Sequence, residues 1–507
     1  MPRNLGARLT PSLMTGAVVA CFLLLVLFGA VGLRGTDQYW YVGDISMQRD
    51  VGHYASNLLY PSYSLNNGTT QLPPPIHHVP MVYVAQFWAW LGLQPYASWV
   101  VTNLLAMLLT AVFIFGVARM LNFARLSVLP VVLFVSFPLT YWHTVNALPD
   151  MALAMGAAGL LFGTQRAQLQ RGASGLIVAA LSVSFLVWSR DDFVLVLVAF
   201  LGYCAWLVRA RGWGWRLVTS VAVGTIVLAP LKALALPKHP SNGLRGALSS
   251  QKTMDFYYGI PDVSIQSLAE KGASGLAGAL LPANAAELMT ELPVLLAMGF
   301  GLWVTRKRSE YSILRLWTVV FFVTYVAACV LFQAQNRYIL PVVPPTSVIF
   351  VAGLRVWMER HPAVRNRRWV WIIATASLVM LFFATSAMMA RHYRAEAHSD
   401  TEQIHDLEGD LATRTSGPLL AVGDSGEIIP VAYAVLPRPV LAVDPSANGP
   451  LSARKLISEW GIHYVLGSDD DLNYLRSALE RTPGGAELES KGLVHTPGGD
   501  LELWLIK

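Results

Sequence analysis

Long apolar runs constrain the fold of this chain more than any other feature of its sequence. A helix needs about 20 apolar residues to cross the hydrocarbon core of a bilayer, and the chain contains about eleven runs of about that length. They lie near residues 13–33, 97–118, 126–143, 148–164, 173–189, 192–208, 216–236, 288–304, 313–333, 338–355 and 369–390. The sequence therefore predicts an all-α polytopic membrane domain.

The composition agrees with a bilayer as the solvent. Of the 507 residues, 54% are hydrophobic and 13% are charged, whereas soluble proteins carry about 25% charged residues. The net charge is +6, but the basic residues lie in short clusters between apolar runs, which indicates membrane topology rather than a nucleic-acid partner. Cys21, Cys204 and Cys329 lie inside apolar runs without metal-ligand spacing, so we expect neither a disulfide nor a zinc site.

The Lys and Arg residues predict the orientation, because cytoplasmic loops retain them. The first run follows Arg3 and Arg8; it is long for a signal peptide and lacks a convincing cleavage site, so we interpret it as the first transmembrane helix. Alternate loops hold the basic set: Arg3, Arg8, Arg119, Arg125, Arg166, Arg171, Arg209, Arg211, Arg216, Arg306, Lys307, Arg308, Arg315, Arg355, Arg360, Arg365, Arg367 and Arg368. We therefore expect a cytoplasmic N-terminus and a bacterial inner membrane location.

The opposite, outer face carries most of the acids and two long loops. The acids are Asp37, Asp44, Asp50, Asp150, Asp191, Asp192, Asp255 and Asp262. The loops cover about residues 34–95 and 237–287, and connections this long are uncommon unless they are functional. Within the first, the apolar and aromatic stretch 79–93 predicts a helix in the membrane interface, with Trp88 and Trp90 at headgroup depth.

The composition changes after Arg391. Short strand-like segments such as LLAVGD, PVLAVD, HYVLGSD and LELWLI alternate with helix-like segments such as ARKLISEW. This alternation predicts a small α/β domain over residues 391–507, which follows the membrane domain of residues 1–390 and lies on the outer, periplasmic side.

Asp37 is the first candidate for chemistry. It opens the first outer loop in the string RGTDQYWYVGD, directly after the first apolar run, with Tyr39 and Tyr41 as candidate acceptor contacts. A carboxylate fixed there could take a proton from an acceptor hydroxyl while a lipid donor stays in the bilayer. The alternative is an aspartate that caps the next helix, and Asp44 and Asp50 are rivals for the same role.

Asp150 is the second candidate. It follows Pro149 at the start of the fourth apolar run, where a carboxylate also complements the helix dipole. A structural role at the helix N-terminus and a role in contacting acceptor or metal both remain open.

Positive charges on the outer side could hold a phosphate. Arg337 lies at the outer start of the tenth run beside Tyr338, and Arg190 lies in a short turn between two runs. Lys238 and His239 add charge to the second long loop. The alternatives are interfacial snorkelling of Arg337, a solvated turn around Arg190 and loop charges with little effect.

No metal-ligand motif is evident. His77 and His78 follow a Pro-Pro-Pro turn but have no third ligand at metal spacing. We therefore assign no metal ligand and no certain cofactor, although a divalent ion remains open.

Four motifs resemble, in order, those of the type C glycosyltransferases, a membrane superfamily that includes protein O-mannosyltransferases and the lipid A aminoarabinose transferase. They are DQYWY from Asp37, LPPPIHHVPMVYVAQFWAWLGL from Leu72, LPDMAL around Asp150 and NRYILPVVPP around Arg337. The resemblance covers about residues 10–390. One departure is Gln38, where many relatives have Glu, and it leaves the choice among Asp37, Asp44 and Asp50 open.

The resemblance implies transfer of a sugar from a polyprenyl-phosphate donor to a glycan, glycolipid or protein acceptor at the outer face, usually with inversion. Asp37 would match the catalytic aspartate, Asp150 the second-loop acid and Arg337 a residue near the carrier phosphate. A lipid-linked sugar flippase or transporter, an O-antigen ligase or polymerase, and a sensor that uses the C-terminal domain are the alternatives.

Overall fold

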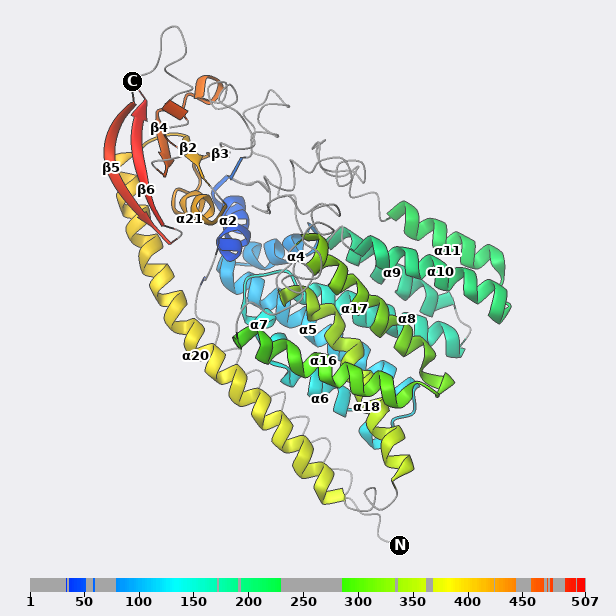
Figure 1. The fold of residues 1–507 in the computed structure, drawn as a ribbon. Helices are drawn as coiled ribbons and strands as arrows, with labels where there is room; N and C mark the ends of the chain where they lie inside the picture. The colour runs from blue at the N-terminus through cyan, green and yellow to red at the C-terminus, as the bar shows by residue number, and fades with distance from the viewer. Residues whose placement is uncertain are drawn as a thin grey trace, which may run out of the picture.

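A computed structural model describes most of the chain. The described residues are 33, 36–51, 58–59, 79–170, 173–189, 193–228, 285–332, 336–361, 368–423, 425–443, 457–468, 472, 475–476, 488–497 and 499–506. Figure 1 shows a helical bundle and, above one end of it, a small sheet near the C-terminus, joined to the bundle by one long helix. The two predicted parts, a helical membrane domain and an α/β domain, are therefore both present.

The membrane domain consists of helices whose positions follow the apolar runs. They are α5 (Pro95–Met120), α6 (Leu129–Ser136), α7 (Pro138–Val145), α8 (Met151–Gln170), α9 (Ala173–Ser189), α10 (Val194–Arg211), α11 (Trp215–Leu228), α16 (Ala285–Thr305), α17 (Ser312–Phe332) and α18 (Val343–Arg360), with the 3-10 helix η4 (Asn336–Val342) before α18. Among the described residues, four helices are long and apolar enough to cross a membrane, and three shorter ones are also apolar. The count of about eleven spans stays a prediction.

The run 126–143 is not one helix, which corrects the sequence-based expectation. α6 ends at Ser136 and α7 starts at Pro138, with Phe137 between them in an extended conformation, ψ 128°. Proline has no N–H to donate and restricts the preceding residue to extended conformations, so a helix readily ends before it. The break gives α7 its own direction, and α7 ends beside the turn that holds Asp150.

The first long loop, which the sequence predicts to lie on the outer side and which we call the first outer loop, contains two helices. α2 (Thr36–Val51) carries the acidic and tyrosine-rich string, and α4 (Val79–Trp90) confirms the predicted aromatic helix. On α4 the side chains of Tyr83, Phe87 and Trp90 are exposed, Trp90 by 75%. Exposed aromatic rings beside an apolar bundle are typical of residues at the membrane interface.

Close backbone approach holds part of the bundle together. A Cβ added at Gly175 of α9 would lie 2.8 Å from the Gly163 carbonyl oxygen of α8, and one at Gly301 of α16 would lie 2.6 Å from the Ile349 carbonyl oxygen of α18. Small residues at such crossings let membrane helices pack by van der Waals contact, because lipid supplies little hydrophobic driving force between them.

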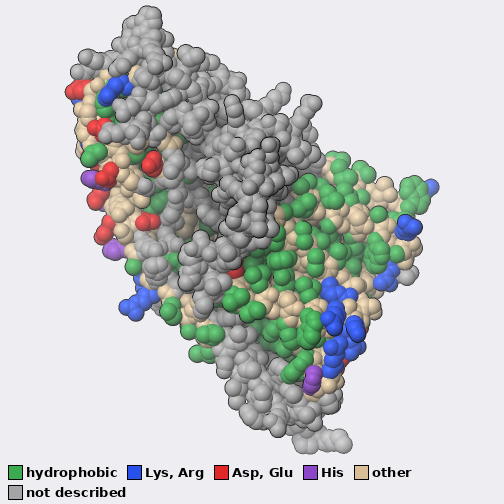
Figure 2. All heavy atoms as spheres, viewed as in Figure 1, with side chains coloured by type: hydrophobic (Ala, Val, Ile, Leu, Met, Phe, Trp, Pro, Cys, Tyr) green, Lys and Arg blue, Asp and Glu red, His purple; other side chains and the backbone are tan. Residues whose placement is uncertain are grey.

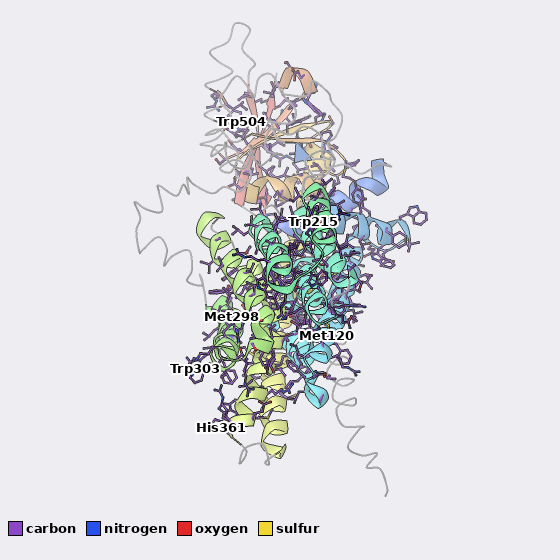
Figure 3. All side chains as sticks on the ribbon, turned by 90° about the vertical axis from the view of Figure 1, so that its right-hand side faces the viewer. Met120, Trp215, Met298, Trp303, His361 and Trp504 are labelled. Atoms are coloured by element: carbon purple, nitrogen blue, oxygen red, sulfur yellow. The ribbon has the colours of Figure 1, made fainter. Side chains whose placement is uncertain are left out.

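The charges separate along the bundle. Figure 2 shows Lys and Arg side chains at the end where α10, α16 and α18 finish, apolar side chains over the middle, and Asp and Glu side chains toward the C-terminal domain. We call the first the basic end and the opposite one the domain end. At the basic end, Trp303 is 62% exposed and points away from the bundle in Figure 3, with the Arg306 guanidinium 5.7 Å from its ring.

α20 (Arg368–Arg414) joins the two domains. The sequence predicts a helix over 369–390, but α20 has 47 residues and continues without a break past residue 391. Its second half lies under the C-terminal sheet, where Ile404, Leu407 and Leu411 are buried in the core of that domain. The boundary between the domains therefore falls within one helix.

The C-terminal domain is a six-stranded sheet in the order β1-β3-β2-β4-β6-β5. Its strands are β1 (Leu58–Leu59), β2 (Leu419–Val422), β3 (Val440–Val443), β4 (Tyr464–Gly467), β5 (Leu488–Thr496) and β6 (Gly499–Ile506), and α21 (Ser425–Ala434) follows β2. β1, β3, β2 and β4 are parallel, while β6 and β5 form an antiparallel hairpin. Parallel strands are covered on both faces, and accordingly Leu419 and Leu420 lie in two different cores.

One strand of this sheet comes from the membrane domain. β1, in the first outer loop, pairs with β3 through the registers Leu58 with Val440 and Leu59 with Leu441. Two residues carry no readable strand pattern, so the sequence did not predict this pairing. The first outer loop is thereby attached to the C-terminal domain.

Candidate functional site

α2 and the turn between α7 and α8 are joined by hydrogen bonds at the domain end. The Gln38 Nε2 atom donates to the Asn146 Oδ1 atom at 3.2 Å, across 108 residues of sequence. The Ala147 N–H group donates to the Gln38 Oε1 atom at 3.4 Å. Gln38 is 3% exposed, so the amide is a buried link between the two segments that carry Asp37 and Asp150.

Side chains of α5 are hydrogen-bonded to α2 and to the turn between α7 and α8. The Asn103 Nδ2 atom donates to the carbonyl oxygens of Asn146 and Leu148, at 2.7 and 2.8 Å. The Trp99 Nε1 atom donates to the Tyr41 carbonyl oxygen at 3.0 Å. Because one helix holds α2 and the turn together, their relative position is fixed by the bundle.

Asp150 lies beside a histidine that the sequence analysis did not single out. Asp150 and His143 are 1% and 0% exposed, and the Asp150 Oδ2 atom lies 3.5 Å from the His143 Nδ1 atom. This distance allows an ion pair when the imidazole carries a proton. Buried ionisable side chains in a membrane domain are costly and mark functional positions.

Several buried polar atoms around this pair have no hydrogen-bond partner within the described part of the chain. They are Thr140 Oγ1, both ring nitrogens of His143, Asn103 Oδ1 and Asn146 Nδ2. Buried polar groups are normally satisfied, so these atoms are hydrogen-bonding capacity that the described residues leave unused.

η4 carries the segment of Arg337 and lies next to the same region. It packs against α7 and α8, and also against α16, α17 and α18. The Tyr325 hydroxyl of α17 donates to the Glu291 Oε2 atom of α16 at 3.3 Å, and Glu291 is 2% exposed. Two buried acidic groups therefore lie near the arginine-bearing segment: Asp150 directly precedes α8, Glu291 lies on α16, and both helices contact η4.

His143 and Glu291 are the residues that sequence reasoning missed. Both lie inside apolar runs, in the strings PLTYWHTV and AAELMTELPVLL. The available signal was an ionisable residue within a predicted transmembrane run, which makes that residue a functional candidate.

The structure describes some of the predicted acids and tyrosines on α2 and leaves the side chains of others undescribed. Asp37 and Asp50 lie on α2, but their side chains are outside the described residues, whereas Asp44 is 4% exposed on the same helix. Tyr41 packs edge-on against Trp99, with ring centroids 5.6 Å apart. Tyr39 is 1% exposed and packs on the C-terminal domain, and burial raises the pKa of its hydroxyl, so that group stays protonated at neutral pH.

The predicted phosphate contacts are described only in part. Arg337 and Tyr338 lie on η4, with side chains outside the described residues, and Arg190, Lys238 and His239 lie outside them altogether. Across the described ranges there is no group of three or more His, Cys, Asp or Glu that could hold a metal ion. The structure therefore brings the segments of Asp37, Asp150 and Arg337 to one end of the bundle, and the roles of these residues stay predictions.

The arrangement of helices, loop and C-terminal domain is shared with two solved structures, which are similar to this chain in fold. ArnT from Cupriavidus metallidurans bound to undecaprenyl phosphate matches over 99% of this chain and 98% of its own, with a TM-score of 0.57 and 15% identity. The oligosaccharyltransferase of Archaeoglobus fulgidus in the apo form matches over 89% of this chain and 69% of its own, with a TM-score of 0.54 and 11% identity. No protein-family model and no curated protein sequence matches the chain.

Proposed function

We propose that this protein is a membrane glycosyltransferase that moves a sugar from a polyprenyl-phosphate donor to an acceptor at the outer face of a bacterial inner membrane. The observation that carries the proposal is the buried link from Gln38 to Asn146, which joins the segment of Asp37 to that of Asp150 beside η4. The shared fold supports it, because one neighbour was solved with undecaprenyl phosphate. The orientation with a cytoplasmic N-terminus and a periplasmic C-terminal domain belongs to the same proposal.

The proposed reaction is an inverting displacement at the anomeric carbon. Asp37 accepts the proton of an acceptor hydroxyl, whose oxygen forms a bond to the sugar. The bond between the anomeric carbon and the phosphate oxygen breaks, and the electron pair leaves with the polyprenyl phosphate. Arg337 stabilises the negative charge of that phosphate, while Arg190, Lys238 and His239 attract it from the outer loops.

Asp150 and His143 serve this reaction from the turn between α7 and α8. A buried carboxylate 3.5 Å from an imidazole keeps a charge available close to the segment of Asp37. In a region with little water such a charge acts more strongly on a reacting proton than it would in solvent. Asp44 and Asp50 are the rival bases on α2. The donor sugar can be a hexosyl or a pentosyl group in this proposal.

A transfer assay tests the proposal. Membranes that contain the wild type, Asp37→Asn, Asp150→Asn or Arg337→Ala receive a panel of radiolabelled polyprenyl-phosphate sugars, and label that leaves the carrier is measured. We expect transfer by the wild type and a loss of at least about 100-fold in Asp37→Asn. Asp406→Asn, an exposed aspartate on α20, is the matched control and should transfer like the wild type.

The alternatives predict other results in the same assay. Label that crosses the membrane while it stays on the carrier would contradict the proposal in favour of a flippase or transporter. Transfer of whole glycans in place of single sugars would point to a ligase or polymerase. If only Asp44→Asn or Asp50→Asn abolishes transfer, the enzyme class stands and the base is reassigned.

A further inference from the structure

α2 is held from two sides by consecutive residues. Gln38 is hydrogen-bonded to Asn146 in the membrane domain. Its neighbour Tyr39 belongs to the core of the C-terminal domain, where its ring lies 5.3 Å from that of Tyr433 on α21. Asp37 directly precedes this pair on the same helix, so both contacts bear on its backbone position.

We infer that the C-terminal domain is a positioning part of the reaction site: through α21 it fixes α2, so the transfer rate depends on how the domain is docked. This inference rests on the proposed function. It names Tyr39 and Tyr433 as positioning residues and gives the C-terminal domain a role in the transfer reaction.

The contact between α2 and α21 is close and specific. A Cβ added at Gly43 of α2 would lie 3.5 Å from the Tyr433 Cδ2 atom and 4.0 Å from the Leu436 Cδ1 atom. An alanine would therefore fit at Gly43, whereas a longer side chain would have to displace Tyr433. Because the side chains of α2 and α21 are closely packed, a shift of α21 would also shift α2.

A second attachment joins the same loop to the same domain. β1, which follows α2 in the first outer loop, pairs with β3 at the edge of the C-terminal sheet. α21 connects β2 to β3, so β1 and α2 both rest on one connected unit of that domain. The loop that bears Asp37 is thus fixed at its start and again after α2.

A third contact reaches the opposite half of the site. Tyr393 of α20 lies against Trp142 of α7, with ring centroids 3.9 Å apart. Trp142 immediately precedes His143, and α20 continues into the core of the C-terminal domain. The domain therefore contacts α2 directly, and through α20 it contacts α7, the helix that leads into the turn bound by Gln38.

Hydrogen exchange of the full-length protein tests this inference without an activity assay. In Tyr433→Ala we expect the backbone amides of α2 to exchange at least about tenfold faster than in the wild type, while those of α9 are unchanged. Gly43→Leu should act in the same direction, and Gly43→Ala should exchange like the wild type. Unchanged exchange of α2 in both Tyr433→Ala and Gly43→Leu would overturn the inference, whatever the transfer assay shows.

Kinetics separate positioning from stability. We expect Tyr39→Ala to lower kcat at least about tenfold with little change in KM for the donor, and Tyr39→Phe to recover most of that loss, because the ring makes the contact. The Gln38 and Tyr39 contacts both position α2. If they act together, the double variant Gln38→Ala with Tyr39→Ala should lower kcat little more than the more harmful single change does. Loss of activity in Tyr39→Phe equal to that in Tyr39→Ala would assign the hydroxyl an acceptor contact and overturn the positioning role.

The two proposals fail in different ways. A wild type that transfers no sugar from any donor sinks the proposed function, and the exchange experiment still decides whether the domain holds α2. Wild-type transfer with a normal kcat in Tyr39→Ala sinks only the inference.

Discussion

The two ends of the helix bundle satisfy their polar groups in different ways. At the basic end, the Arg315 Nη1 atom donates to the carbonyl oxygens of Thr305 and Arg308, and the Arg355 Nη1 atom donates to those of Leu121 and Asn122. At the domain end, buried polar atoms of His143, Asn103 and Asn146 have no partner within the described part of the chain.

The difference separates charges whose hydrogen bonds are made within the protein from buried ionisable groups that are candidates for the reaction. The guanidinium groups of Arg315 and Arg355 bind carbonyl oxygens at or next to helix ends. These hydrogen bonds stabilise the fold. At the domain end of the bundle, the ionisable side chains of His143 and Asp150 are buried and lie close to polar atoms that have no partner among the described residues. The density of charge alone would therefore not identify the candidate site.

The largest effect is expected at the domain end. Asp150→Asn removes the charge beside His143 and should lower the transfer rate about 100-fold or more, because acid and base groups typically contribute that much. The initial rate at saturating donor is the measurement, with thermal unfolding in detergent to show that the fold persists. A rate within about threefold of the wild type would remove Asp150 from the reaction.

Close packing in the half of the bundle toward the basic end should be the next most sensitive feature. Gly163→Leu places a side chain where even a Cβ would lie 2.7 Å from the Gly175 carbonyl oxygen, and overpacking of this kind costs about 1–3 kcal/mol. The midpoint of thermal unfolding should fall clearly. Gly202→Leu is the control, since no atom lies within 4 Å of a Cβ added there, and equal effects of the two changes would contradict the packing argument.

Arg315→Ala should destabilise the fold without affecting the chemistry. Loss of the guanidinium leaves the carbonyls of Thr305 and Arg308 without this donor, at a cost of about 1–2 kcal/mol. We expect a lower unfolding midpoint and a normal kcat per folded molecule. Arg306→Ala, which removes an exposed guanidinium near Trp303, should change the midpoint less, and a large loss of kcat in Arg315→Ala would break the comparison between the two ends.

The smallest effect is expected for an exposed ion pair at the basic end. The Arg308 Nη2 and Glu359 Oε2 atoms are 3.0 Å apart, but the two side chains are 40% and 43% exposed. A double-mutant cycle with Arg308→Ala and Glu359→Ala should give a coupling of about 1 kcal/mol or less, because water screens such pairs. A coupling well above that value would show that exposed ion pairs at the basic end also stabilise the fold.

The sequence predicted what depends on long or regular patterns. The apolar runs located α5, α9, α16 and α17 to within a few residues, and LLAVGD, PVLAVD and LELWLI marked strands of the C-terminal sheet. Long patterns average over many residues, so single exceptions do not hide them. The aromatic helix α4 was found for the same reason.

Features that depend on one residue or on distant pairing were missed. One proline split the run 126–143, and a two-residue strand, β1, joined a sheet whose other strands lie more than three hundred residues later. In the sequence, Gln38 was only a departure from the motif of the resembling family. In the structure, its side chain is hydrogen-bonded to Asn146. Contacts of this kind are created by the fold, and no local pattern encodes them.

The number of residues in α20 determines how the C-terminal domain is rotated about the helix axis relative to the membrane domain. At about 1.5 Å and 100° per residue, its 47 residues form a rod of about 70 Å whose far end keeps a defined bearing relative to its start. One residue inserted near position 395 would swing the sheet about 100° around the rod, while seven would raise it by about two turns and nearly restore the bearing. The chain length of this helix, and not only its side chains, is therefore part of what the C-terminal domain needs in order to meet α2.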